Sequence, residues 1–314
     1  MNGLVRYWNQ NRKRLITGIA ILAFLIIVVR ILNGIAKEQN RRERENRVVL
    51  TEEEQKLPTE SIIGAGGVSV ETAKEDVSQI EQFVEFCNKG EITAAYNMLT
   101  DDCKKTEFTT LEDFTQRYHA HVFKVRKIAD IKNFGNSNNR DIYLVNFYED
   151  VLATGNGKTT NPYTDYITID KNQNNKISLR GLIYREELNS SSEYGGVKFT
   201  VVARNMYKDK EEFEITVENN SGKRIAINTG RSEEGVYAVG NNNISYGSNI
   251  LQLSATQRQV PDRITRTYKI EFPKTFSSGV KITRIAFTDI VPDYEAYQNA
   301  PSQVNDRIQI FINL

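Results

Sequence analysis

The chain contains few of the residues from which catalytic and metal sites are built. Its 314 residues include two cysteines, two histidines and one tryptophan. It lacks the His-Glu-x-x-His, Gly-x-Ser-x-Gly and Gly-x-x-x-x-Gly-Lys patterns of zinc peptidases, serine hydrolases and phosphate-binding loops. Gly64, Gly66 and Gly67 do not form a phosphate loop, because no Lys-Ser/Thr pair follows them and no apolar strand precedes them. The sequence therefore predicts a protein without catalytic residues, cofactor or metal ion.

The two cysteines, Cys87 and Cys103, leave two alternatives open. They could form one disulfide in an oxidising compartment, or remain as two buried thiols. With His119 and His121 they are also of the types that bind zinc. Cys87 belongs to the apolar face of a predicted helix, however, and the spacing of the four residues matches no common zinc pattern. No cysteine precedes Cys87, which excludes a lipoprotein anchor.

Acid–base catalysis has few candidate residues. His119 and His121 are the only histidines, and Asp130 lies four residues from Arg126 on one face of a predicted strand. A catalytic site would need such groups buried and within reach of one another. We expect instead that the histidines are exposed at a helix end and that Asp130 is a surface partner of Arg126.

The longest apolar run extends from Leu15 to Ala36 and predicts a transmembrane helix. Its 22 residues would span roughly 30 Å as a helix, which is the thickness of a bilayer core. Arg30 lies near one end, where a long side chain can reach the headgroups. Tyr7 and Trp8 flank the other end. The residues that mark this predicted membrane anchor are Leu15, Phe24, Val29, Arg30 and Ala36.

A cleaved signal peptide is the alternative interpretation of this run. Arg12–Arg14 would be its charged region, Leu15–Val29 its apolar core, and Gly34–Ala36 its small-residue cleavage site. The charged stretch Lys37–Gln55 is more typical of a juxtamembrane stalk, which favours a retained helix. Basic residues are nearly balanced across the run, with four before it and five soon after it. A short tail before a single helix commonly stays inside, so we place most of the chain outside the cytoplasm.

Charge divides the chain into two unequal parts. Residues 1–50 carry ten Lys/Arg against three Asp/Glu, a net charge of +7. The remaining residues carry 31 against 37, a net charge of −6. The basic end suits anionic lipid headgroups of the bilayer. The acidic remainder argues against nucleic-acid binding, which requires a basic face on the folded domain.

Residues 73–190 have the pattern of an α+β domain. Val77, Ile80, Phe83, Val84 and Cys87 fall on one face of a helix that Gly90 ends. A second helix is predicted over Ile92–Leu99, and Thr110 with Asp113 resembles the capping box of a third, with Leu111, Phe114 and Tyr118 on its apolar face. Strands are predicted at Val125–Phe134, Ile142–Val151, Tyr163–Asp170 and Ile177–Tyr184.

Residues 194–314 have the pattern of an all-β sandwich. Seven short strands are predicted, at Val197–Tyr207, Glu212–Asn219, Arg224–Asn228, Val236–Val239, Ile264–Phe272, Lys281–Thr288 and Arg307–Ile312. Between the last two lies a predicted loop, Asp289–Asn305, that is rich in Tyr, Pro and Asn. Tyr294 and Tyr297 near its middle are candidate interface anchors, although packing back onto the sandwich is the simpler alternative.

Two segments carry resemblances to known families. Glu85–Leu99, with its Ala-Tyr-x-x-Leu ending, and Phe108–Phe114 resemble the helices of nuclear transport factor 2-like domains. That resemblance implies a curved sheet wrapped around helices, with a mouth that forms a pocket or a docking surface. Phe213–Lys223 resembles immunoglobulin-like domains of Gram-positive surface proteins. A helix, a stalk and a cone domain together resemble scaffold proteins of Gram-positive conjugative (type IV secretion) machines, although the second domain here is predicted to be a sandwich instead of a second cone.

The sequence thus predicts a single N-terminal transmembrane helix, then an α+β cone-like domain and an all-β, immunoglobulin-like sandwich. The predicted parts are a short basic cytoplasmic tail (1–14), the transmembrane helix (15–36), a charged stalk and Gly-rich linker (37–72), the α+β domain (73–190) and the sandwich (194–314). The predicted function is a non-enzymatic assembly subunit of an envelope complex, with the lipid bilayer, other membrane proteins and a second copy of the chain as partners. A ligand-binding envelope protein that acts alone is the alternative, and a pocket enzyme on the cone domain is a third.

Overall fold

The structure is a computed structural model that describes residues 54–64, 66–150, 161–230, 235–274, 278–301 and 306–314. The chain divides into two units, residues 1–56 and 57–314. In the first unit the described part is a short 3₁₀ helix, η1 (Glu54–Lys56). The predicted tail, the transmembrane helix with its marker residues, and most of the stalk lie outside the described residues. Among the described helices none is long and apolar enough to cross a membrane.

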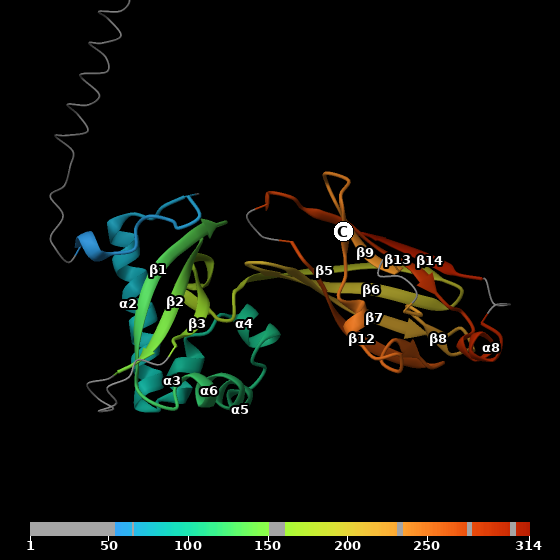
Figure 1. Cartoon of the computed structure of the whole chain (residues 1–314), viewed down its shortest axis with the longest axis horizontal. Helices are drawn as coiled ribbons and strands as arrows, with labels where there is room; N and C mark the ends of the chain where they lie inside the picture. The colour runs from blue at the N-terminus through green and yellow to red at the C-terminus, as the bar shows by residue number, and fades with distance from the viewer. Residues whose placement is uncertain (1–53, 65, 151–160, 231–234, 275–277, 302–305) are drawn as a thin grey trace, which may run out of the picture. The chain divides into compact units, whose positions relative to one another are not determined.

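The second unit is mostly β-sheet with a few helices, and two lobes can be distinguished in it (Figure 1). We call residues 57–181 the helical lobe and residues 182–314 the sheet lobe. The helices of the first lobe are α2 (Val70–Lys89), α3 (Ile92–Asn97), α4 (Asp101–Thr106), α5 (Leu111–Phe114), the π-helical turn η2 (Thr115–His119) and α6 (Ala120–Val122). Its antiparallel sheet has the order β1 (Lys127–Ser137), β2 (Arg140–Glu149), β3 (Tyr163–Asp170) and β4 (Lys176–Ser178), with η3 (Lys171–Gln173) between the last two.

The long helix α2 begins and ends as its sequence predicts. The Ser69 hydroxyl accepts a hydrogen bond from the Thr72 N–H, and Gly90 closes the helix with φ 72°. Ile80, Phe83, Val84 and Cys87 are buried against one face of the sheet, so the predicted apolar stripe is confirmed there. The lobe's core is strongly aromatic, because Phe83, Phe108, Phe114 and Tyr118 pack against one another with ring centroids 5.4–6.3 Å apart.

The predicted third helix is only partly regular. The Thr110 hydroxyl accepts from the Asp113 N–H at 3.1 Å, which confirms the cap. Phe114 and Tyr118 are buried, but Leu111 is 37% exposed, so its assignment to the apolar face is wrong. The chain widens into the π-helical turn η2 after Phe114, and that widening brings Tyr118 onto the core face without Leu111.

The sheet lobe contains two four-stranded antiparallel sheets and a short β-ladder. One sheet has the order β12 (Ile264–Phe272), β7 (Glu211–Asn219), β6 (Val197–Tyr207) and β5 (Leu182–Tyr194). The other has the order β10 (Ser245–Gly247), β9 (Val236–Gly240), β13 (Ile282–Ile290) and β14 (Ile308–Asn313). The ladder pairs β8 (Ile225–Ala226) with β11 (Gln259–Val260), and the remaining elements are η5 (Ile250–Gln252) and α8 (Tyr294–Asn299). Phe199 of β6 packs on Phe287 of β13 with ring centroids 4.6 Å apart, so the core of this lobe lies between the two sheets.

Strand β5 runs across the predicted boundary between the domains. The predicted strand Ile177–Tyr184 is two strands, because Arg180 and Gly181 take positive φ values of 58° and 74° and turn the chain between them. β5 then runs to Tyr194 and pairs with β6, so residues 182–190 belong to the sheet lobe. The predicted linker is also part of the helical lobe. The Ile62 N–H donates to Asn133 O at 3.0 Å, and the Ser61 hydroxyl donates to Phe134 O at 2.8 Å, which covers the edge of β1.

The positive φ of Gly90 gives a test of the helical lobe. No atom lies within 4 Å of a Cβ added at Gly90 or at Gly247, but only Gly90 has a positive φ. We therefore expect Gly90→Ala to lower the free energy of unfolding by about 1 kcal/mol, because a side chain is strained in that conformation. Gly247→Ala is the matched control and should change it by less than about 0.5 kcal/mol. Urea denaturation of the purified chain measures both, and equal effects would contradict the assigned cap.

Candidate functional site

The residues that suggested acid–base chemistry are not brought together. His119 is half-buried, with Nε2 2.9 Å from Cys87 O and its ring stacked on Phe123, whereas His121 is exposed. The expectation that both histidines are exposed is therefore wrong for His119. Asp130 lies on β1, where it contacts Lys132 at 3.5 Å and the Asn146 side-chain amide at 3.4 Å.

The predicted pair between Arg126 and Asp130 is also wrong. The guanidinium of Arg126 instead contacts Glu85 of α2 at 3.0 Å and Asp150 at 3.3 Å. Arg126 precedes β1, so the alternation that would put it on the face of Asp130 does not apply to it. Both residues are engaged in surface ion pairs.

Cys87 and Cys103 are free thiols, so the structure contains no disulfide between them. Both are buried in the core of the helical lobe, on α2 and α4. Burial raises the pKa of each thiol well above its ordinary range, which keeps both protonated and unreactive. No group of three or more His, Cys, Asp or Glu side chains that could hold a metal ion occurs in the described part of the chain.

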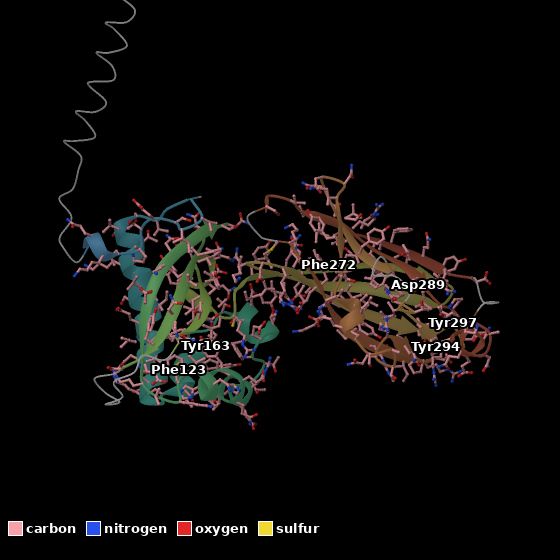
Figure 2. The ribbon with its side chains drawn as sticks, viewed as in Figure 1. Phe123, Tyr163, Phe272, Asp289, Tyr294 and Tyr297 are labelled. Carbon is pink, nitrogen blue, oxygen red and sulfur yellow. The ribbon has the colours of Figure 1, made fainter. Side chains whose placement is uncertain are left out.

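Tyr294 and Tyr297 lie on the short helix α8, where a loop was predicted. Asp293 caps this helix, because its carboxylate accepts from the Ala296 N–H at 2.9 Å. The two rings (Figure 2) are 6.1 Å apart between centroids. The guanidinium of Arg307 lies 5.2 Å from the centre of the Tyr297 ring. Both tyrosines are half-exposed, so one face of this pair stays open to solvent.

Buried carboxylates are the feature of the helical lobe that the sequence analysis missed. Asp165 of β3 is 4% exposed and accepts hydrogen bonds from the Tyr118 hydroxyl at 2.8 Å and the Tyr166 N–H at 2.7 Å. Burial raises its pKa to about 7 in spite of these bonds. A signal was present in the sequence, because Asp165 shares its strand face with Ile167 and Ile169.

Two further buried carboxylates, those of Asp76 and Asp141, share one lysine. Lys171 of η3 forms ion pairs with Asp76 of α2 and, at 3.6 Å, with Asp141 of β2. The Tyr143 hydroxyl donates to Asp76 at 2.9 Å. Burial and the nearby Asp76 charge raise the pKa of Asp141 to about 6. Each of these polar groups holds a helix or a turn onto the sheet.

Polar contacts made by α4 and by Glu107, the residue that follows it, join the two lobes. The Tyr207 hydroxyl donates to the Glu107 carboxylate at 2.5 Å, and the Lys269 ammonium donates to Thr106 O at 3.0 Å. The Asp102 carboxylate accepts from the Arg185 N–H at 3.0 Å. An apolar cluster lies beside these contacts and contains Ile142, Phe134 and Tyr166 of the helical lobe with Ile183, Tyr184 and Met206 of the sheet lobe.

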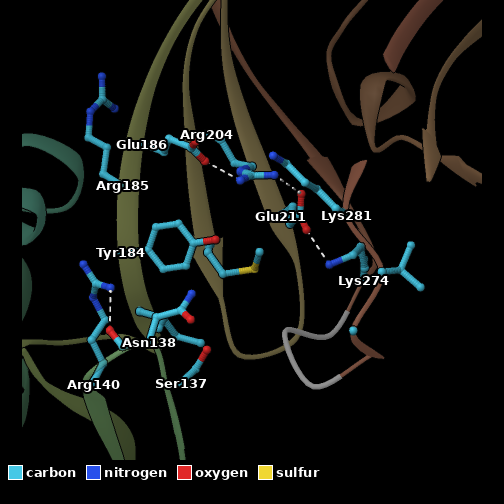
Figure 3. Close-up of a pocket in the computed structure, with 14 residues that line it drawn as sticks. Ser137, Asn138, Arg140, Tyr184, Arg185, Glu186, Arg204, Glu211, Lys274 and Lys281 are labelled. Carbon is cyan, nitrogen blue, oxygen red and sulfur yellow. Dashed lines mark hydrogen bonds and ion pairs between the residues drawn. The ribbon is translucent and has the colours of Figure 1, made fainter. Parts of the chain in front are cut away.

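A cleft of about 680 Å³ lies where the lobes meet, and we call it the interlobe cleft (Figure 3). The β1–β2 hairpin contributes Ser137, Asn138 and Arg140, and the sheet lobe contributes the rest. Those residues are Ile183, Tyr184, Arg185, Glu186, Arg204, Met206, Glu211, Lys274, Gly279, Val280 and Lys281.

Buried charges form one wall of the interlobe cleft. The side chains of Arg204, Glu211 and Lys274 are 6%, 0% and 2% exposed. Lys274 donates to Glu211 Oε1 at 2.5 Å, and Arg204 donates to Glu186 (Figure 3). Two atoms of this cluster, Glu211 Oε2 and Arg204 Nε, are buried without a hydrogen-bond partner. Unpartnered buried atoms of this kind cost about 1–3 kcal/mol each. Others lie at Asn133, Thr168 and Arg258, but those residues do not line the cleft.

Asp165 gives a test of the buried carboxylates. The pKa of the Asp165 carboxyl is 3.8 when it is exposed and about 7 in the fold. The protonated carboxyl therefore favours the folded state at low pH, and this stabilisation is lost as the pH rises from about 4 through 7. We expect this group to remove about 2–3 kcal/mol of stability between pH 5 and pH 8. Asp165→Asn should flatten that part of the pH dependence, whereas Asp130→Asn, on the half-exposed face, should leave it as in the wild type. Urea denaturation at the two pH values measures this, and an unchanged slope in Asp165→Asn would contradict the assignment.

Comparison with known proteins gives no relative from which a role could be transferred. No protein-family model, no curated protein and no solved structure matches the chain. The functional argument therefore depends on the geometry of the described residues and on the sequence of the N-terminal segment.

Proposed function

We propose that this protein is a non-enzymatic, membrane-anchored assembly subunit of an envelope complex. In this proposal residues 15–36 form a single transmembrane helix, and residues 57–314 lie outside the cytoplasm. The helical lobe would be a cone-type, nuclear transport factor 2-like domain, and the sheet lobe would be an immunoglobulin-like sandwich. A conjugative (type IV secretion) machine of a Gram-positive bacterium is the proposed complex.

The observation that carries the proposal is that the ionisable side chains inside the helical lobe are engaged in contacts that hold the fold together. His119 holds η2 to the end of α2, Asp165 holds Tyr118 in the core, and Lys171 bridges two carboxylates. A catalytic group must be available to a substrate, whereas these groups are engaged in folding contacts. Their engagement supports a structural role over a pocket enzyme in the helical lobe.

The contacts between the lobes support the same role. β5 begins in the core of the helical lobe and continues as a strand of the sheet lobe, and α4 adds polar contacts on both sides of the join. A subunit of this construction presents two different surfaces that are fixed to one backbone. Helices packed on a four-stranded sheet suit the cone-type domain, and two packed four-stranded sheets suit the sandwich.

The anchor part of the proposal is tested by deletion. A chain that lacks residues 15–36 should move from the membrane fraction to the soluble fraction, because no other segment is proposed to hold it in the bilayer. Fractionation with immunoblotting measures the distribution, and a deletion of 22 residues from Lys37 to Pro58 is the length-matched control, which should stay with the membrane. A wild-type chain that is soluble and begins at Lys37 would instead establish the signal-peptide alternative.

The assembly part is tested by crosslinking in cells, detergent extraction, affinity purification and identification of the bound proteins. We expect other membrane subunits or an ATPase of a secretion machine to be recovered with the full chain. Recovery should fall at least tenfold with the chain that lacks residues 15–36, because its partners lie in the membrane. Recovery of the full chain alone, as a monomer, would overturn the assembly role and favour a ligand-binding envelope protein.

A further inference from the structure

We infer that the interlobe cleft is a binding site for a small carboxylate that also carries a hydrogen-bond donor, and that its ligand is the C-terminal end of a short peptide. This site goes beyond the assembly role proposed above and does not depend on it. The inference stands on three properties of the cleft: an exposed lysine without an ion-pair partner among the described residues, two unpartnered buried atoms and an apolar surface (Figure 3).

One cation of the interlobe cleft differs from the others in having no carboxylate beside it. Arg140 and Arg185 line it, but each has carboxylate partners that do not line it: Asp170 at 3.0 Å for Arg140, and Glu187 and Glu214 for Arg185. Arg204 and Lys274 are balanced by Glu186 and Glu211. Lys281 is exposed, and its ammonium has no ion-pair partner among the described residues. Lys281 is therefore the cation of the cleft that no described carboxylate contacts, and its exposed ammonium favours a negatively charged group beside it.

The unpartnered atoms define what else the ligand must carry. Arg204 Nε is a free donor and Glu211 Oε2 a free acceptor, and the Arg204 guanidinium lies 4.0 Å from that same Oε2 atom. One ligand would therefore satisfy both if it held an acceptor next to a donor. A carboxylate that accepts from Arg204 forms a charge-assisted hydrogen bond, and an adjacent N–H could donate to Glu211. The last residue of a peptide carries both groups on neighbouring atoms.

Both atoms are covered by their neighbours in the wall, so a ligand must reach them through rotation of a side chain. Lys281 is the exposed cation of the cleft and is therefore the first contact for a carboxylate. Its four-carbon stem leaves the ammonium free to follow the ligand inward. The rotation exchanges the contact of Arg204 with Glu186, or of Glu211 with Lys274, for contacts with the ligand. In return, Arg204 Nε and Glu211 Oε2 gain hydrogen bonds that they lack in the free protein.

The apolar part of the cleft suits the side chain of such a residue. Tyr184 and Val280 line the cleft together with the deeper Ile183 and Met206. Ser137 and Asn138 of the β1–β2 hairpin add polar groups at the opposite wall, where they could contact the peptide backbone. An apolar terminal side chain would cover the aliphatic and aromatic surface, while the carboxylate stays at the charged wall.

The test uses the full chain in detergent and three probes: an N-acetylated alanyl-alanyl-leucine tripeptide with a free carboxylate, the same tripeptide amidated at its C-terminus, and inorganic phosphate. Isothermal titration calorimetry should show binding of the free acid and at least tenfold weaker binding of the amide, because the amide loses the charge. Phosphate should bind at least tenfold more weakly than the free acid, because it has no apolar group for the cleft.

Variants at lysines outside the buried cluster locate the site without disturbing that cluster. Lys281→Met should weaken binding of the free acid at least tenfold, whereas Lys198→Met, on the outer face of β6, should leave it unchanged. Both variants should have the wild-type melting temperature, since neither lysine is buried. Equal affinity for acid and amide, phosphate binding as tight as the peptide's, an unchanged affinity in Lys281→Met, or no binding at millimolar peptide would each overturn the inference.

Discussion

The course of strand β5 is the constraint on which the architecture of residues 57–314 depends. Leu182 at its start is buried in the aromatic core of the helical lobe, and Ile183 enters the apolar cluster between the lobes. The strand pairs with β6 from Leu182 to Tyr194, and Leu188 packs against the core of the sheet lobe. Neither core is complete without this strand. A change at Leu182 or Ile183 would therefore act on both lobes at once, unlike a change in the middle of either core.

The polar character of the junction follows from the same constraint. A strand that begins in the core of one lobe and continues in the sheet of the other leaves backbone groups and sheet ends that must find partners where the lobes meet. The carboxylate of Asp102 meets the Arg185 N–H, and the Lys269 ammonium meets Thr106 O. Buried ion pairs are a weak source of stability, because desolvation offsets their attraction. An ion pair forms only when its two partners are correctly placed, so buried pairs specify which surfaces meet. This specificity explains why Arg204, Glu211 and Lys274 form a charged cluster and not an apolar one.

Much of the local structure can be predicted from the sequence, and the errors have physical causes. β3, β6 and β12 have the predicted bounds, because each alternates apolar and polar residues between clear turns. α4 was missed because Asp101–Thr106 buries only Cys103 and Thr106, so it has no apolar stripe to detect. The break in the fourth predicted strand depends on Arg180 in a left-handed conformation, which residue type does not reveal.

The candidate site is harder to predict than the fold, for a different reason. The interlobe cleft joins Ser137 on one hairpin to Lys281, which directly precedes β13 far along the chain, and only the tertiary structure brings them together. Asp165 could have been found, because an aspartate on the inward face of a strand breaks the apolar pattern. Glu211 sits on the inward face of β7 in the same way, next to Phe213 and Ile215, but its partner Lys274 follows β12. The residue pattern of one strand can indicate that a charged side chain is buried. It does not identify the counter-ion, which comes from another part of the fold.

The position of the interlobe cleft gives any ligand an effect beyond its own binding. Its walls come from both lobes, so a molecule that contacts the β1–β2 hairpin and the charged wall at once is bound only while the two lobes are joined. Ligand present at a hundred times its dissociation constant would stabilise that joined state by about 2.7 kcal/mol. This is larger than the net contribution of a typical hydrogen bond at the junction. A site of modest affinity would therefore strengthen the joint between two surfaces that, in an assembly subunit, must hold their places while partners bind.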